Sequence, residues 1–220
     1  HLHREQIGSP IDPFLRLLNT EIWTDQHVGE LSGFDVLSRH DAETYACLDH
    51  NIILPGEERA VQKYERLTRI EMRSWNDRRG KTRYVMMEHR LKDIEAYVLK
   101  MVRKNSLHPE AVDDAVGLNL TFQHKRDIEE FLLVLQAAAH RDGSTIRYED
   151  ITDTIGNIDQ YQNVNPGSSS KFEVVKVHLV FNGVRIELMI HTIRTYLNYR
   201  YQDEISWDEY QIRTVGTITA

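Results

Sequence analysis

The chain has 220 residues, of which 40% are hydrophobic and 28% are charged, and its formal net charge is −7. This length and apolar content suffice for one sizeable core, while the single cysteine excludes an internal disulfide framework and the longest apolar run, residues 131–139, is too short to cross a bilayer. No CxxC, GxGxxG, Walker A or HExxH pattern occurs, which excludes zinc modules, Rossmann dinucleotide sites and P-loop NTPases.

Residues 1–84 are predicted to form a helical N-terminal region. Asp12-Pro13 precedes an apolar run and Pro55-Gly56 interrupts the chain, which are typical helix start and stop signals. A long basic helix is expected over residues 57–76, ending at the polar residues 76–80. Its buried stripe would consist of Val61, Tyr64, Leu67, Ile70 and Met72.

This region also carries an uneven charge. Between residues 59 and 83 nine basic residues stand against three acidic ones, so the segment is locally +6 although the whole chain is negative. A solvated helix face explains such a charge density, and an electrostatic lining for a polyphosphate or an RNA end explains it equally well. The basic residues are Arg59, Lys63, Arg66, Arg69, Arg73, Arg78, Arg79, Lys81 and Arg83.

A helix, a strand and a second helix are expected next. Residues 88–104 are predicted to form a helix with Arg90 and Lys92 near its start, directed away from an apolar stripe. Residues 114–122 are predicted to form a half-buried strand, and residues 126–140 a second amphipathic helix. The supporting apolar positions are Leu91, Ile94, Val98 and Met101, then Val116, Leu118, Leu120 and Phe122, then Ile128, Phe131, Leu132 and Leu135.

The hairpin at residues 174–192 has the strongest local signal. Asn182-Gly183 suits a type I′ turn, because both residues tolerate a positive φ and alternating residues flank them. A two-residue turn fixes the register, so Phe181 pairs with Val184 and one face of the hairpin is wholly apolar. The other face pairs His178 with Glu187, Lys176 with Met189 and Val174 with His191.

The order of these motifs resembles that of the RelA/SpoT-like alarmone synthetases. Arg90-Leu91-Lys92 stands where that family has R-x-K, and residues 114–119 follow its D-x-x-G-x-R with Asn119 in place of the last Arg. In the hairpin the family has Y-x-S-x-H and E-x-Q-x-R-T. His178, Glu187 and Thr192 match these motifs, whereas Val174, Lys176, Met189 and His191 replace the Tyr, Ser, Gln and Arg. The resemblance covers residues 85–200. It implies an α+β fold, a mixed β-sheet flanked by helices, with a nucleotidyltransferase-like synthetase core placed at residues 85–220.

The resemblance also implies an activity. Members of the family transfer the β,γ-pyrophosphoryl group of ATP to the ribose 3′-hydroxyl of GDP or GTP and release AMP. By this likeness Asp114 and Glu187 would bind Mg²⁺, and Glu187 would also activate the hydroxyl. Arg90 and Lys92 would bind the ATP phosphates. His178, which faces Glu187 across the hairpin, would orient that carboxylate.

Several of these residues also have a purely structural explanation. Asp114 and its neighbour Asp113 are both suited to cap a turn, and only the spacing to Gly117 favours Asp114. Most surface acids are simply solvated. Arg90 and Lys92 are equally consistent with ordinary surface cations, although the start of a helix is not where the helix dipole prefers them.

The acceptor is the point at which the chain departs most from the family. Family members stack guanine on the tyrosine of Y-x-S-x-H, and Val174 offers no aromatic ring. This predicts a different base, such as the adenine used by adenosine-directed toxin relatives, or another stacking residue such as Tyr161. Lys176, Met189 and His191 are assigned to the acceptor side of the predicted site.

Three hypotheses about function follow. The first is an ATP-dependent nucleotide pyrophosphokinase, acting in the cytoplasm or as a toxin or effector domain delivered into one. The second is pyrophosphorylation of a tRNA 3′ end, for which the basic segment at residues 59–83 is suited. The third is an inactive binding domain, which Asn119 and His191 would permit although retention of Asp114 and Glu187 opposes it. The expected ligands are ATP, Mg²⁺ and a nucleotide acceptor; no membrane partner is expected, and the oligomeric state is left open.

Overall fold

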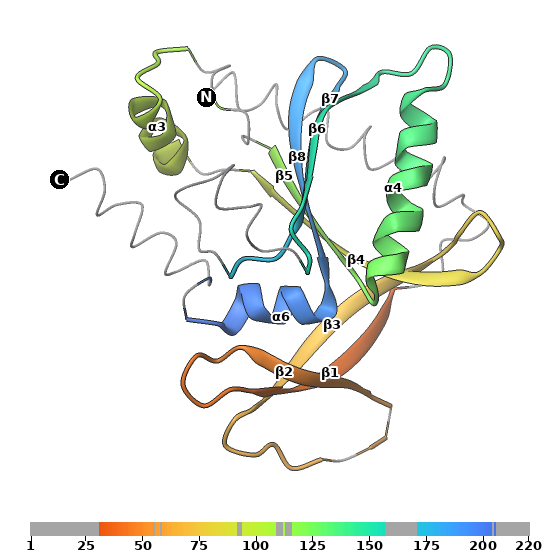
Figure 1. The fold of residues 1–220 in the computed structure, drawn as a ribbon, viewed down its shortest axis with the longest axis vertical. Coiled ribbons are helices and arrows are strands. Elements are labelled where there is room, and N and C mark those ends of the chain that lie inside the picture. Colours follow the sequence, from red (N-terminus) through yellow and green to blue (C-terminus); the bar gives the residue numbers. More distant parts are fainter. Residues whose placement is uncertain are drawn as a thin grey trace.

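The computed structural model describes residues 31–54, 56–57, 59–91, 94–108, 112, 116–156, 171–203 and 205, and the structural statements below concern these residues. Eight strands form one sheet in the order β2-β1-β3-β4-β5-β8-β7-β6, accompanied by helices α3, α4 and α6 (Figure 1). The elements are β1 (Ser32–His40), β2 (Cys47–Ile53), β3 (Glu65–Asn76), β4 (Thr82–Leu91), α3 (Ile94–Arg103), β5 (Val116–Phe122), α4 (Lys125–Ala139), β6 (Ile146–Asp153), β7 (Val175–Phe181), β8 (Val184–Thr192) and α6 (Ile193–Tyr201).

The expected fold class, a mixed sheet flanked by helices, is confirmed. Strands β5 and β8 pair in parallel, and the other neighbouring strands that the structure describes pair antiparallel. The parallel pair places the ends of both strands at the same edge, where β5 leads into α4 and β8 into α6. Within the described part of the chain no helix could cross a bilayer, because none joins sufficient length to sufficient apolar character.

The helical N-terminal region expected over residues 1–84 is wrong for residues 32–84, where β1, β2, β3 and the start of β4 lie. The basic helix expected over residues 57–76 is wrong as well, because β3 occupies most of it. Thr68, Ile70 and Met72 are buried while the residues between them are exposed, which is the alternation of a strand. Residues 1–30 lie outside the described part, and the domain boundary expected at residue 84 falls inside β4.

The physical reason for this difference is that the local pattern of β3 satisfies two periods. Ile70 lies three positions after Leu67, as in a helical stripe, and also two positions before Met72, as on a strand face. Pairing decides between them, since β1 lies along one edge of β3 and β4 along the other. Both edges of its backbone are thereby hydrogen-bonded in the sheet.

The helix expected over residues 88–104 begins only at Ile94, and residues 88–91 belong to β4. Residue 90 therefore lies in a strand and pairs with Gly117 of β5, rather than opening a helix. The reason is again pairing, because the half-buried β5 takes β4 as its antiparallel neighbour over seven residue pairs. The helix expected over residues 126–140 is confirmed as α4.

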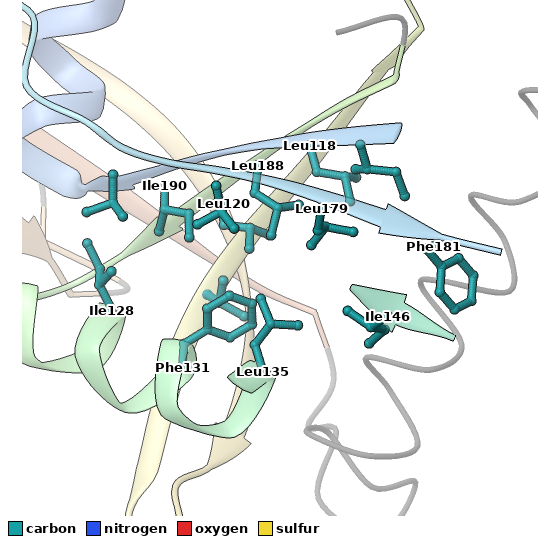
Figure 2. Close-up of a cluster of buried hydrophobic side chains, with 14 of the residues drawn as sticks. Leu118, Leu120, Ile128, Phe131, Leu135, Ile146, Leu179, Phe181, Leu188 and Ile190 are labelled. Carbon is teal, nitrogen blue, oxygen red and sulfur yellow. The ribbon is translucent and has the colours of Figure 1, made fainter. Parts of the chain in front are cut away.

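The hairpin of β7 and β8 is confirmed in turn and register. Asn182 and Gly183 have φ values of 48° and 82°, as a type I′ turn requires. Phe181 pairs with Val184 and His178 with Glu187. The apolar face of the sheet packs against α4, whose Ile128, Phe131 and Leu135 point toward the strands in Figure 2. The strand residues labelled in that view are Leu118, Leu120, Ile146, Leu179, Phe181, Leu188 and Ile190.

Helix α6 covers part of the opposite face of the sheet. Its residues Ile193, Tyr196 and Leu197 pack in a second buried cluster with Met86 of β4 and with apolar side chains of β1 and β3. Met86 pairs with Thr121, which pairs in turn with His191, so these residues share a face that α4 does not cover. The polar side of the β7–β8 hairpin lies on that same face.

Candidate functional site

One register row of the sheet brings the candidate catalytic residues together. Residue 90 of β4 pairs with Gly117 of β5, Gly117 with Glu187 of β8, Glu187 with His178 of β7, and His178 with Asp150 of β6. Residues paired across neighbouring strands share a face of the sheet. Gly117 contributes no side chain to this row, so the position between Glu187 and residue 90 is left without one.

Glu187 is the centre of the site. The residue is only 8% exposed, and its Oε1 atom lies 3.1 Å from Lys176 Nζ and 3.3 Å from His178 Nε2. Burial opposes ionisation of this carboxyl, but the hydrogen bond from His178 and the charge and hydrogen bond of Lys176 outweigh it and lower the pKa of Glu187 to about 2. The carboxylate is therefore ionised at neutral pH and held by the Lys176 ammonium and the His178 imidazole.

His178 bridges two carboxylates. Its Nε2 faces Glu187, and its Nδ1 lies 2.6 Å from Oδ1 of Asp150. The hydrogen bond to Glu187 raises the pKa of His178, burial lowers it, and the hydrogen bond to Asp150 raises it further, so the net shift is upward. An imidazole that donates from both nitrogens is a cation, and this arrangement favours that form.

Of the acceptor residues that the structure describes, Lys176, Met189 and His191, only Lys176 forms an ion pair with Glu187. Met189 packs with Phe172, Val174 and other members of a small apolar cluster beside the row. His191 is fully buried and stacks on Tyr199 at 5.5 Å between ring centroids. Burial lowers the pKa of His191 to about 3. Met189 and His191 therefore act in packing here.

Val174 also has a different environment from the one the sequence suggested. Its side chain is fully buried and packs with Phe172 and Ile205. Thr154 hydrogen-bonds both its backbone nitrogen and its carbonyl oxygen at 3.0 Å. The position that would hold the stacking ring is thus filled by the core of the protein, and no base can stack on residue 174.

Four further predicted site residues lie wholly or partly outside the described structure. Lys92, Asp114 and Tyr161 lie outside the described residues. For Arg90 the structure describes the strand backbone, which lies in register with Gly117. The roles of these residues remain predictions.

The basic segment does not form the helical lining that was expected. Arg83 is partly buried and paired with Asp77 at 2.8 Å and with Asp127 of α4. Arg69 pairs with Asp35 at 3.1 Å on the surface. Two of the charges that made this segment basic, on Arg69 and Arg83, thus face acids from outside the segment, Asp35 and Asp127.

The described residues do not by themselves fit a magnesium site. No three His, Cys, Asp or Glu side chains among them converge as metal ligands would. Glu187 supplies a single carboxylate, and the oxygen with described contacts is held by Lys176 and His178. A divalent cation at that oxygen would have to displace the Lys176 ammonium and the His178 imidazole, which lie 3.1 Å and 3.3 Å from the oxygen.

Asp150 is the residue of this site that the sequence did not indicate. It lies on β6, a strand for which no expectation was made, 28 residues before His178. No local pattern relates the two positions. Only prediction of β6 as the neighbour of β7, with the correct register, would have found the contact.

Comparison with known proteins gives similar solved structures only. No family model matches the chain, and no curated protein matches it. The chain is similar to small alarmone synthetase 1 from Bacillus subtilis, at 18% identity over 61% of this chain and 72% of that one, with a TM-score of 0.39. For the same protein bound to its product pppGpp the values are 19%, 61%, 71% and 0.38. For a GTP pyrophosphokinase family protein from Streptococcus pneumoniae they are 20%, 61%, 68% and 0.35.

Proposed function

We propose that this chain is an ATP-dependent pyrophosphokinase that transfers the β,γ-pyrophosphoryl group of ATP to the 3′-hydroxyl of a nucleotide. The observation that carries the proposal is the arrangement around Glu187. An ionised, nearly buried carboxylate is flanked by Lys176 and His178 at the hairpin positions of the alarmone-synthetase motifs. Residue 90 and Gly117, from two further motifs, lie in the same register row.

The proposed reaction forms one bond and breaks one. The acceptor hydroxyl oxygen bonds to the β-phosphorus of ATP, while the bond from that phosphorus to the oxygen retained by AMP breaks. The hydroxyl proton leaves toward Glu187, which accepts a hydrogen bond from the hydroxyl and orients it. Lys176 supplies positive charge beside the transferring phosphates, and Arg90 and Lys92 bind the remainder of the triphosphate. Dependence on Mg²⁺ remains part of the proposal through Asp114 and the phosphates, and no step is assigned to the ion.

The base of the acceptor nucleotide is inferred from the burial of residue 174. Because Val174 is buried among Phe172 and Ile205, guanine cannot be held there by stacking. We favour an acceptor with another base, adenine in the first instance. The tRNA hypothesis depended on a basic helix over residues 57–76, and strand β3 lies in most of that range instead. Deacylated tRNA is therefore kept only as one of the acceptors to be tested.

Product analysis with labelled ATP tests the assignment. The full chain is incubated with Mg²⁺, β-phosphate-labelled ATP and, in turn, AMP, ADP, ATP, GDP, GTP or deacylated tRNA. Release of AMP together with a pyrophosphorylated acceptor is the expected result. Absence of both with every acceptor would reject the enzyme and leave a nucleotide-binding domain.

Glu187→Gln tests the site within that assay. Loss of the carboxylate should lower the transfer rate by at least about 10²-fold, which is typical for a positioned base. Glu149→Gln is the matched control, because Glu149 lies on β6, two strands away from Glu187 in the same sheet, and pairs with Arg185 at the surface. Circular dichroism should show that both variants fold. Near wild-type transfer by Glu187→Gln would place the reaction elsewhere.

A further inference from the structure

Asp150 reaches the candidate site because strand β6 is irregular. Tyr148 pairs with Leu179 of β7, and two residues further along β6 Asp150 pairs with His178, the immediate neighbour of Leu179. Glu149 is therefore the extra residue of a β-bulge. Bulges change which side chains face a given side of a sheet and are frequent beside functional sites.

The bulge determines which acid meets His178. In a regular ladder Glu149 would be the partner of His178, and Asp150 would pair with Val177 on the apolar side of the sheet. With the bulge, Asp150 lies beside His178, and Glu149 instead forms surface ion pairs with Arg147 and Arg185. The irregularity of the strand thus places one carboxylate beside His178.

The resulting chain of contacts runs from solvent into the site. The side chains of Asp150, His178 and Glu187 are 54%, 27% and 10% exposed, in that order. Asp150 binds Nδ1 of the imidazole at 2.6 Å, and Nε2 lies 3.3 Å from Glu187. A hydrogen bond at one ring nitrogen fixes the orientation of the ring and the state of the other nitrogen.

We infer that Asp150 is a positioning residue, which holds the imidazole of His178 with its Nε2–H directed at Glu187. Without Asp150 the ring of His178 is free to turn or to present a lone pair to the Glu187 carboxylate, which would repel it. The consequence for catalysis rests on the proposed function, because a displaced Glu187 would no longer meet the acceptor hydroxyl. The contact geometry itself does not depend on that function.

Asp150→Asn in the full chain tests this inference. The turnover number kcat should fall about 10- to 100-fold, since small misplacements of a catalytic group cost on the order of 10²-fold, while KM for ATP should stay within about twofold. Asp150→Glu, which retains a carboxylate, should recover part of the loss. Asp153→Asn is the matched control, because Asp153 lies on the same strand and pairs with Lys125 at the surface.

Nuclear magnetic resonance provides a readout that does not need turnover. The ¹³C signal of the Glu187 carboxylate and the Nδ1–H signal of His178, at a fixed pH, should shift in Asp150→Asn and not in Asp153→Asn. These shifts with the loss of kcat would establish the role. If the same shifts occur but the chain makes no product with any acceptor, the proposed function is rejected and the positioning role is supported. An unchanged Glu187 signal, or unchanged kcat in an active enzyme, would overturn the inference.

Discussion

Lys176 occupies a position that the resembling family gives to serine, and it changes the chemistry of its neighbour. Its ammonium lies 3.1 Å from Glu187, and it contributes to the downward shift that brings the pKa of that carboxyl to about 2. A carboxylate with so low a pKa is a weak base in the free protein. Under the proposed function, a Lys176 ammonium that turned toward a bound phosphate would leave the carboxylate with one partner fewer and would make it more basic.

Lys176→Met should therefore raise the pKa of Glu187. The folded-state pKa lies below the ordinary value of 4.5, so the ion pair stabilises the protein above about pH 4.5, and this stabilisation is lost as pH falls toward 2. As pH falls from 4.5 toward 2, the variant should lose less unfolding free energy than the wild type. The difference should be about 1.4 kcal/mol for each unit by which the Glu187 pKa rises. Carboxyl ¹³C titration and urea unfolding at several pH values measure both effects.

The control for this variant is Lys125→Met. Lys125 makes a comparable contact, 3.2 Å to Asp153, but both side chains are 43% exposed. Such an exposed ion pair contributes far less to the free energy of unfolding than a buried one. Its removal should leave the titration of Glu187 unchanged. If the pKa of Glu187 were the same in Lys176→Met as in the wild type, the Lys176 ammonium would have no effect on the pKa of this carboxyl.

At the level of elements, the β7–β8 hairpin depends on its turn. Asn182 and Gly183 both adopt a left-handed backbone conformation, and this turn sets the register that places His178 opposite Glu187. The strands themselves are well buried on one face. The turn therefore contributes to stability and, through register, to the site.

Gly183→Ala should lower the free energy of unfolding by about 1–2 kcal/mol, because a side chain at φ 82° is sterically strained. Nothing crowds this position in space, so the cost is one of backbone conformation alone. Asn182→Asp is the control, since aspartate also tolerates the left-handed region. Urea denaturation compares the three proteins, and a loss as large in Asn182→Asp would contradict the explanation.

At the scale of the whole molecule, one partly buried arginine joins distant parts of the chain. Arg83 of β4 pairs with Asp77 in the β3–β4 turn and with Asp127 in the first turn of α4. The three side chains are 11%, 1% and 2% exposed, so the charges depend on one another. The triad ties the strands that precede residue 84 to the helix that covers the core.

Arg83→Met should lower the free energy of unfolding by about 3–5 kcal/mol, because it leaves two buried carboxylates without their cation. Arg78→Met is the matched control. Arg78 pairs with Glu130 on the same helix at 3.3 Å, but its side chain is 53% exposed, and such a pair contributes about 0–1 kcal/mol. Thermal and urea unfolding test both variants, and equal losses in the two would mean that burial of the triad is unimportant.

The sequence by itself determined the hairpin, the strand at β5 and helix α4. Each of these has a single dominant period, and the Asn182-Gly183 turn specifies register over two residues without help from the rest of the chain. The pairing of His178 with Glu187 followed from that register. Glu187 as the centre of a candidate site was therefore accessible from local information.

Only the tertiary structure decided the remainder. Residues 65–76 satisfied both a helical and a strand period, and the choice was made by β1 and β4 on either side. The burial of Val174 depends on Phe172 and also on Ile205, which is distant in the sequence and which no local pattern relates to it. Asp150 enters the site through a bulge defined only by the partner strand. Contacts between distant segments depend on register across strands and on packing, and neither is encoded in the periodicity of a single segment.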